Sequence, residues 1–399
     1  MDDNFASDSK VEMPGAGQLI KAIALIIVVS LLFGLVGLGY LSLIYLFSLW
    51  NSGRNAQGVH DIKAPGASRL GGLVGALIFV SAVFILVLTS PYKPGSILYS
   101  SSDFWQFMGM PPSVDISFSS YMEVLYQWSV IIICALLGLR KDYEPNYLSP
   151  KLGIAVSALL FGLLLYLVPD LIIHPEYLSA PLLDQLLKAK PIAWAITTVW
   201  CLFFVHAFKR IDEANGLVPG ISTFALVIFF IIRGYPAEAA LLFSCTLFLL
   251  FNVIYGRLFF GAMGSYALGA YLVIYSLQGF AQGIFSAAFL LALFAYPCID
   301  FLTSIEWRLT NKLPLFIRDN GYLHNLIYNW LKASRGSGLL ANSLTGVLIS
   351  CSSSGLVLVG FLMQWWPATS GQWIWLFLLQ CLFYWVVSIV LTRAGYVAD

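Results

Sequence analysis

The sequence predicts an all-α, polytopic membrane protein, built as a bundle of about eleven transmembrane helices. Of its 399 residues, 59% are hydrophobic and only 10% are charged, and the mean hydropathy is +0.84. Soluble domains carry about 25% charged residues, so this composition excludes an ordinary soluble domain. Several apolar runs reach the roughly 20 residues that cross a bilayer. Within lipid only helices and closed barrels satisfy the backbone, and we expect each run to be helical.

Eleven apolar runs are candidate spans, and we treat residues 19–399 as one membrane domain that follows a polar tail at 1–18. The first run is too long for a cleavable signal peptide, and acidic rather than basic residues precede it. The two short runs, 124–139 and 218–233, could be tilted or partly buried in protein. The candidate spans are 22–49, 70–90, 124–139, 152–173, 191–208, 218–233, 236–254, 262–279, 283–303, 343–364 and 372–392.

The distribution of basic residues predicts the orientation. If the first loop is cytoplasmic, the same side carries most of the 21 lysine and arginine residues. Cytoplasmic loops are enriched in these residues, so we expect the N-terminus outside and the C-terminus in the cytoplasm. The predicted cytoplasmic loops lie near 51–69, 140–151, 206–217, 256–264 and 304–342.

Other features indicate packing rather than chemistry. The net charge of +1 and the lack of a basic tract give no support for a nucleic-acid partner. All six cysteines fall inside predicted spans, which favours apolar packing over disulfides or metal ligands. Outside the cytoplasmic loops, we expect Glu238, at the start of a span, to pair with Arg233.

The first and second predicted cytoplasmic loops each allow two interpretations. The first contains His60, Arg69 and the pair Gly71–Gly72. Glycines at a helix start let backbone N–H groups approach a ligand and arginine pairs with phosphate, but the same residues suit a turn and a close helix crossing. In the second loop, Asp142 follows a span directly and could hold a cation, act as a base, or pair with Lys141.

The third predicted loop, 205–217, places four charged side chains where a span ends, and we interpret the loops as one composite site. Charges are costly inside a bilayer, so such a cluster marks a loop boundary or an interfacial polar site. Its polar residues are His206, Lys209, Arg210, Asp212, Glu213 and Asn215.

The fourth and fifth loops add further polar groups. Gly261, Gly264 and Ser265 lie at the start of a predicted helix, where they could form an anion site or a helix-packing face. Asp319 and His324 suit a polar site or a surface amphipathic helix. Asp300 is an intramembrane carboxylate and therefore a functional candidate. A transporter is a third candidate class of protein. Transporter binding sites lie near the membrane midplane, whereas the polar groups of this sequence gather at one face of the membrane.

Taken together, these loops resemble the bacterial polyprenyl-phosphate N-acetylhexosamine-1-phosphate transferases of glycosyltransferase family 4. That family includes undecaprenyl-phosphate GlcNAc-1-phosphate transferases and phospho-MurNAc-pentapeptide translocases. The motifs that carry the resemblance follow one another in the family's order. They are Q-x-x-H and R-I-G-G at 57–72, G-L-x-D/E-D and L-S-P-R at 138–151, N-A-F-N-x-I-D-G-x-N/D-G-L at 206–217, G-K-x-F-L-G-D-x-G-S-x-x-L-G at 256–269, Y-P-x-x-E/D-T-x-x-S-I at 296–305, P-D-x-x-H-L-H-x-L-I-Y at 319–328 and N-S-x-T at 342–345.

The resemblance implies a reaction at the bacterial inner membrane, in cell-envelope polysaccharide synthesis. A polyprenyl phosphate attacks the β-phosphate of a UDP-sugar and UMP leaves, with Mg²⁺ neutralising the diphosphate. The implied catalytic residues are Asp142, Asp212 and His324, the two aspartates being the metal ligands. A homodimer is left open. The implied substrate-binding residues are His60, Arg69, Lys141, His206, Lys209, Asn215, Gly261, Gly264, Ser265 and Asp319.

The sequence departs from the family at positions that carry the chemistry. Lys141 and Ala262 replace acidic residues, and His206 and Lys209 replace two asparagines; Glu213 replaces a glycine and Tyr322 a histidine. Fewer carboxylates weaken a magnesium site, which requires oxygen ligands in near-octahedral order. Two hypotheses follow. The chain is a transferase in which basic side chains replace the charge of the metal, or an inactive relative that binds lipid phosphate or nucleotide-sugar, or regulates an active partner.

Overall fold

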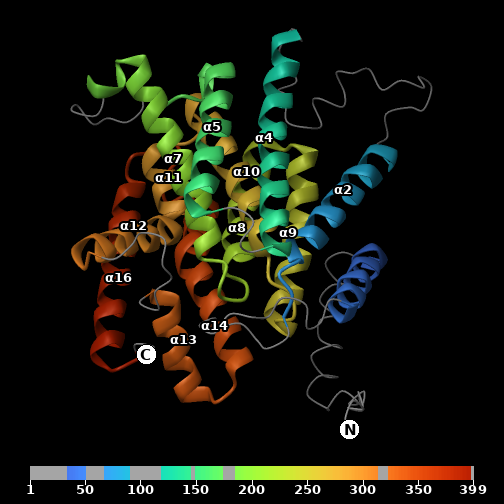
Figure 1. Ribbon diagram of the computed structural model, residues 1–399, viewed down its shortest axis with the longest axis vertical. Helices are drawn as coiled ribbons and strands as arrows, with labels where there is room; N and C mark the ends of the chain where they lie inside the picture. The colour runs from blue at the N-terminus through green and yellow to red at the C-terminus, as the bar shows by residue number, and fades with distance from the viewer. Residues whose placement is uncertain are drawn as a thin grey trace, which may run out of the picture.

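The computed structural model describes residues 34–50, 67–89, 118–144, 149–173, 185–312 and 322–396, and this part of the chain is helical (Figure 1). The prediction of an all-α membrane protein is confirmed. After a first helix, Gly34–Trp50, the elements are α2 (Gly71–Thr89), α4 (Phe118–Tyr143), α5 (Pro150–Leu167), η1 (Pro169–Leu171), α7 (Lys190–Arg210), α8 (Leu217–Arg233), α9 (Pro236–Tyr255), α10 (Gly261–Ala281), α11 (Ala287–Leu293), α12 (Ala295–Thr310), α13 (Leu323–Arg335), α14 (Gly338–Ser350), a π-helical turn η3 (Cys351–Gly355), α15 (Leu356–Leu362) and α16 (Trp373–Arg393).

The number of spans is smaller than expected. Among the described residues, six helices are long and apolar enough to cross a membrane, or up to seven if one bent pair counts as a span. Three further apolar helices, including α8, are shorter. The prediction of about eleven spans is therefore not supported, because apolar runs also form short and buried helices. The predicted orientation stays a prediction.

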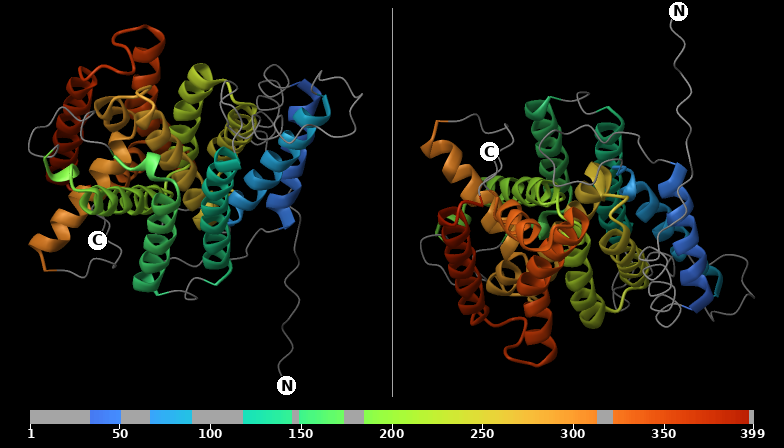
Figure 2. Two further views of the ribbon diagram at one scale, coloured as in Figure 1. Left: turned by 90° about the horizontal axis from the view of Figure 1, so that it is seen from above. Right: turned by 90° about the horizontal axis from the view of Figure 1, so that it is seen from below.

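Helix α10 is the centre of the bundle. It packs against α4, α7 and α2, and it lies between them in the views of Figures 1 and 2. Most of its side chains are buried, as expected for a helix that is apolar on all sides. Small residues allow this close packing, since a Cβ on Gly269 would lie 3.1 Å from the Cα atom of Val205 on α7.

Short local signals set the helix boundaries. The Ser149 hydroxyl accepts a hydrogen bond from the N–H of Leu152 and caps α5, whose first residue is proline. Gly234 ends α8 and Gly256 ends α9, both in the left-handed conformation that glycine adopts without strain. These residues keep the connections short, so the polar loops stay close to the bundle.

The apolar run expected as one span at 283–303 is broken. Helices α11 and α12 meet at Phe294 with a bend of 80°, and α12 lies crosswise to the upright helices at the left of the view (Figure 1). One face of α12 carries polar side chains at every fourth position, which places them in a row along the helix. These buried side chains are Tyr296, Asp300, Ser304 and Arg308.

A buried ion pair connects α8, α9 and α10 far from the predicted site. Arg233 Nε lies 3.5 Å from Glu238 Oε1, with 3% and 0% of the two side chains exposed, which confirms the predicted pairing. The Arg233 guanidinium also stands 4.7 Å from the ring centres of Tyr235 and Tyr275, and it donates to Gln278 over 3.0 Å. The pair thus fastens the α8–α9 hairpin to α10.

Removing one partner of this pair should destabilise the fold more than removing both. We expect Glu238→Ala to cost about 3–5 kcal/mol, because it leaves the Arg233 charge buried without its carboxylate. The double replacement Arg233→Met/Glu238→Leu should cost less, since no charge remains. Unfolding followed by intrinsic fluorescence in detergent measures both. Equal losses in the two variants would contradict this account.

Candidate functional site

The first and fourth loops dock on each other through their backbones. The Ser68 N–H donates to the Arg257 carbonyl over 2.9 Å, and the Ser68 carbonyl accepts from Phe259 N–H over 2.9 Å. Gly71 N–H donates to the Phe259 carbonyl, also over 2.9 Å, and a Cβ on Gly71 would lie 2.3 Å from that oxygen. Of the two interpretations of this glycine, the structure therefore supports the packing one.

Gly261 is required by the turn that begins α10. Its φ angle is +72°, and a Cβ there would lie 2.0 Å from the Arg69 carbonyl oxygen and 2.6 Å from Asp142 Oδ2. Only a glycine fits this space and this conformation. Arg69, Asp142 and Gly261, which come from three predicted loops, are thus brought together.

Asp142 caps the N-terminus of α10. Its Oδ1 atom accepts from Ala262 N–H over 2.8 Å, and its Oδ2 atom accepts from Met263 N–H over 2.9 Å. The side chain is 2% exposed. A carboxylate at this position satisfies two backbone donors that have no partner within the helix and interacts favourably with the helix dipole. Asp142 therefore fixes the end of α4 on the start of α10.

Asp212 lies next to Lys209 at the end of α7. The Lys209 ammonium is 3.3 Å from Asp212 Oδ2, and 23% of the lysine side chain and 5% of the aspartate side chain are exposed. The Lys209 charge also interacts with the Asp142 carboxylate and with Tyr266. We call Lys141, Asp142, Lys209, Asp212 and Tyr266 the Lys209 cluster.

Tyr266 contacts two of the predicted site residues, Lys141 and His206. Sequence analysis did not select Tyr266, and its position one turn into α10 is the signal that could have indicated it. The Lys141 ammonium donates to the Tyr266 hydroxyl over 3.3 Å. The ring of His206 meets the ring of Tyr266 edge to face, with 5.7 Å between their centres. His206 Nε2 is buried and has no hydrogen-bond partner among the described residues.

Asn215 serves the fold of the third loop. Its N–H donates to Asn342 Oδ1 over 2.7 Å, and its side-chain amide donates to the Ser343 hydroxyl over 3.3 Å. The next N–H, of Gly216, donates to Asn252 Oδ1 over 2.5 Å. These bonds tie the loop to α9 and α14. They explain the Asn-Ser pair at 342–343 without a ligand.

His324 is enclosed. Its Nε2 atom is 3.3 Å from Glu213 Oε2, and its Nδ1 atom is 2.9 Å from the Tyr296 hydroxyl. The ring stacks on Tyr322 with 5.3 Å between centres, and His324 is 0% exposed. Both nitrogens are occupied, so a ligand reaches this imidazole only if a neighbour moves. We call Glu213, Tyr296, Asp300, Tyr322 and His324 the His324 cluster.

Asp300 anchors the far end of the His324 cluster. Its Oδ1 atom accepts from the Tyr384 hydroxyl over 3.0 Å and from the Tyr296 hydroxyl over 3.4 Å. Asp300 is 0% exposed, and its Oδ2 atom has no hydrogen-bond partner among the described residues. Sequence analysis singled out this carboxylate, and Tyr296 lies four residues earlier in the same motif, but Tyr384 on α16 carries no recognisable spacing.

Arg210 turns away from the Lys209 cluster. Its guanidinium donates to the hydroxyls of Ser304 and Tyr322, and it lies 4.2 Å from the centre of the Tyr322 ring. Arg308 donates to the same Tyr322 hydroxyl over 2.9 Å. Tyr322, one of the departures from the family motifs, is therefore the contact point of two guanidinium groups.

Some of the remaining predicted residues take part in helix packing, and others lie outside the described residues. The Ser265 hydroxyl donates to the Gly261 carbonyl over 2.7 Å, within α10. A Cβ on Gly264 would lie 1.9 Å from the Phe260 ring, and one on Gly72 would lie 2.3 Å from the Gly264 nitrogen. Predicted residues His60 and Asp319, the tail at 1–18 and parts of the first and fifth loops lie outside the described residues.

The described side chains do not fit a magnesium ion. The described residues include no group of three or more His, Cys, Asp or Glu side chains placed to hold a metal. Both Asp142 oxygens already accept backbone hydrogen bonds, and the Lys209 ammonium stands beside Asp212. A divalent ion about 4 Å from that ammonium would be repelled by on the order of 8 kcal/mol at an effective dielectric constant near 20.

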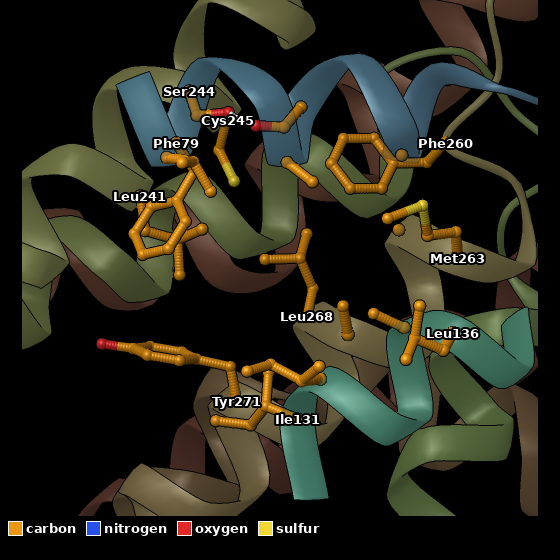
Figure 3. A pocket seen from close by; sticks show the side chains of 18 of the residues that line it. Phe79, Ile131, Leu136, Leu241, Ser244, Cys245, Phe260, Met263, Leu268 and Tyr271 are labelled. Atoms are coloured by element: carbon orange, nitrogen blue, oxygen red, sulfur yellow. Dashed lines mark hydrogen bonds between the residues drawn. The ribbon is translucent and has the colours of Figure 1, made fainter. Parts of the chain in front are cut away.

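An apolar cavity of about 420 Å³ opens beside the start of α10. It lies between α2, α4, α9 and α10, and one end is formed by Phe260 and Met263, the residue whose N–H bonds to Asp142 (Figure 3). The other end reaches Phe79 and Tyr271 (Figure 3). A polar cluster and a hydrocarbon-lined space thus adjoin the same helix terminus.

Comparison with known proteins supports the family resemblance. The sequence model of glycosyl transferase family 4 matches residues 124–280. A probable undecaprenyl-phosphate N-acetylglucosaminyl 1-phosphate transferase of Bacillus subtilis (strain 168) is 25% identical over 213 residues, which cover 51% of this chain and 56% of the relative. An undecaprenyl-phosphate alpha-N-acetylglucosaminyl 1-phosphate transferase of Thermotoga maritima is 30% identical over 128 residues, which cover 32% and 40%.

This chain therefore spans about half the length of the curated relatives that it matches. The residues that match the family contain Lys141, Asp142, the third loop and the start of α10. They do not reach His324. The match to the family model thus covers the Lys209 cluster, whereas only Glu213 of the His324 cluster falls within it.

If Asp142 is a structural cap, its removal should destabilise the protein. We expect Asp142→Ala to cost about 2 kcal/mol, because the N–H groups of Ala262 and Met263 lose their acceptors. Asp142→Asn keeps one acceptor and should cost less. Thermal unfolding in detergent without added ligand distinguishes them. Stabilisation by Asp142→Ala would instead indicate a repelled carboxylate kept for chemistry.

Proposed function

We propose that this multi-pass membrane protein moves a sugar-1-phosphate from a UDP-sugar to a polyprenyl phosphate. The reaction would serve cell-envelope polysaccharide synthesis at the bacterial inner membrane. The observation that carries the proposal is the convergence of the ends of α4 and α7 on the start of α10. In this arrangement Asp142 caps the N-terminus of α10, Lys141 bonds to Tyr266 one turn further on, and Lys209 and Asp212 interact electrostatically with Asp142. All three segments lie within the residues that match the family.

The chemistry requires positive charge around two phosphate-bearing substrates. A lipid-phosphate oxygen attacks the β-phosphorus of the UDP-sugar, the bond from that phosphorus to the bridging oxygen breaks, and UMP leaves. Lys141 and Lys209 would stabilise the negative charge that collects on the phosphate oxygens. Asp212 would hold the Lys209 ammonium in position. The apolar cavity beside Met263 suits the hydrocarbon part of a lipid substrate.

A second candidate function is binding without turnover. The specific observation in its favour is the enclosure of His324 by Glu213 and Tyr296, together with the use of both Asp142 oxygens as a helix cap. Two of the three residues to which the resemblance assigns catalysis are thereby occupied. In this case the chain would bind lipid phosphate or nucleotide-sugar and regulate an active partner, with a homodimer as one possible assembly.

Release of UMP by the purified full chain distinguishes the two functions. With undecaprenyl phosphate and a panel of UDP-sugars, we expect the wild type to release UMP only when the lipid is present. Asp212→Asn should reduce the rate by roughly 100-fold or more, because the Lys209 ammonium loses the group that positions it. Lys332→Asn, on the exposed face of α13, serves as a matched control.

A second variant defines the opposite result. Lys141→Asp/Ala262→Asp restores the two acidic residues of the family motifs. Turnover by this variant alone, in the presence of Mg²⁺, would show that the wild type has lost catalysis and would support the binding function. Undiminished turnover by Asp212→Asn would contradict the assignment of the site.

A further inference from the structure

Lys209 lies where the family resemblance places a divalent cation. Its ammonium stands 3.3 Å from Asp212 Oδ2, and its charge also interacts with Asp142. These two aspartates are the residues to which the resemblance assigns metal binding. The family motif has an asparagine at this position, which brings no charge. In this chain a covalently attached cation therefore pairs with one of these two carboxylates and interacts electrostatically with the other.

The surrounding structure holds this ammonium in place. Lys209 belongs to the last turn of α7, and Asp212 follows three residues later, so the ion pair is local and short. Asp142 cannot turn away because its two oxygens cap α10. The Lys209 side chain is 23% exposed, so the structure does not enclose it completely.

The other basic groups of the third and second loops do not take this position. Arg210 points to Ser304 and to Tyr322, and Tyr322 belongs to the His324 cluster. Lys141 donates to the Tyr266 hydroxyl. An ammonium group carries three donors, so Lys209 can bond to Asp212 and to a phosphate oxygen at the same time.

We propose that the Lys209 ammonium is a resident cation that replaces the divalent metal, so that the site binds a phosphate or diphosphate group without one. The class of ligand rests on the proposed function. The replacement of the metal does not, and it can be tested with a metal ion alone. The phosphate could belong to a lipid or to a nucleotide-sugar, and separate titrations identify the source.

The first test measures binding of Mn²⁺ to the full chain in detergent, using the electron paramagnetic resonance signal of the free ion. We expect the wild type to leave Mn²⁺ free. Lys209→Asn/Ala262→Asp, which restores the family residues, should bind one ion at least about tenfold more tightly than the wild type. Lys332→Asn should behave as the wild type does.

Two results would overturn the proposal. One is a stoichiometric Mn²⁺ site in the wild type that Asp212→Asn removes. The other is a folded double variant, with the circular dichroism and elution volume of the wild type, that binds Mn²⁺ no better. If the double variant fails to fold, the Mn²⁺ titration of the wild type still tests whether the native site binds a metal ion.

The second test titrates UDP-N-acetylglucosamine and undecaprenyl phosphate separately, each with EDTA and with Mg²⁺. We expect at least one of them to bind the wild type equally well under both conditions. Its affinity should fall by about tenfold or more in Lys209→Met, which keeps the length of the side chain but removes the charge. Binding that requires Mg²⁺ would overturn the proposal. If neither ligand binds, the proposed function fails, while the Mn²⁺ result still judges the role of Lys209.

Discussion

The capping of α10 by Asp142 is the interaction on which the arrangement of the site depends. The first N–H groups of a helix have no acceptor within it, and a buried donor without a partner is costly in a membrane. Asp142 satisfies two of them, and Gly261 allows the carboxylate to approach. Because Asp142 lies in the last turn of α4, this contact fixes two helices relative to each other and brings Lys141 to Tyr266.

Much of the fold could be predicted from hydropathy, because the apolar runs of the sequence coincide with helices. The number of spans could not. An average over some twenty residues does not register a bend such as the one at Phe294, and it does not separate a short buried helix such as α8 from a spanning one. The pairing of Arg233 with Glu238 was predictable, since a five-residue separation across a tight turn leaves them few other partners.

The sequence was enough to predict which loops meet at the candidate site, but not what each side chain does there. Asp142 and Asn215 were selected as chemical groups, but in the structure the Asp142 carboxylate accepts from backbone N–H groups, and Asn215 bonds to Asn342 and Ser343 to hold its own loop. The contact of His324 with Glu213 joins residues 111 positions apart, and no local spacing indicates it. Such long-range contacts depend on the packing of α7, α12 and α13, which composition does not specify.

The departures from the family motifs change the charge of the site in one direction around Lys209. Lysine replaces an acidic residue at 141 and an asparagine at 209, and alanine replaces an aspartate at 262. Each change makes the Lys209 cluster more positive, as a bound divalent cation would. Loss of a metal site accounts for the missing acidic residues, but it does not account for the positive charges that Lys141 and Lys209 add. Glu213 is the one change of opposite sign, since an acidic residue replaces a glycine, and it contacts His324 rather than Lys209. Asp212 and Glu213 are neighbours in the sequence, but Asp212 belongs to the positive cluster and Glu213 contacts the enclosed imidazole.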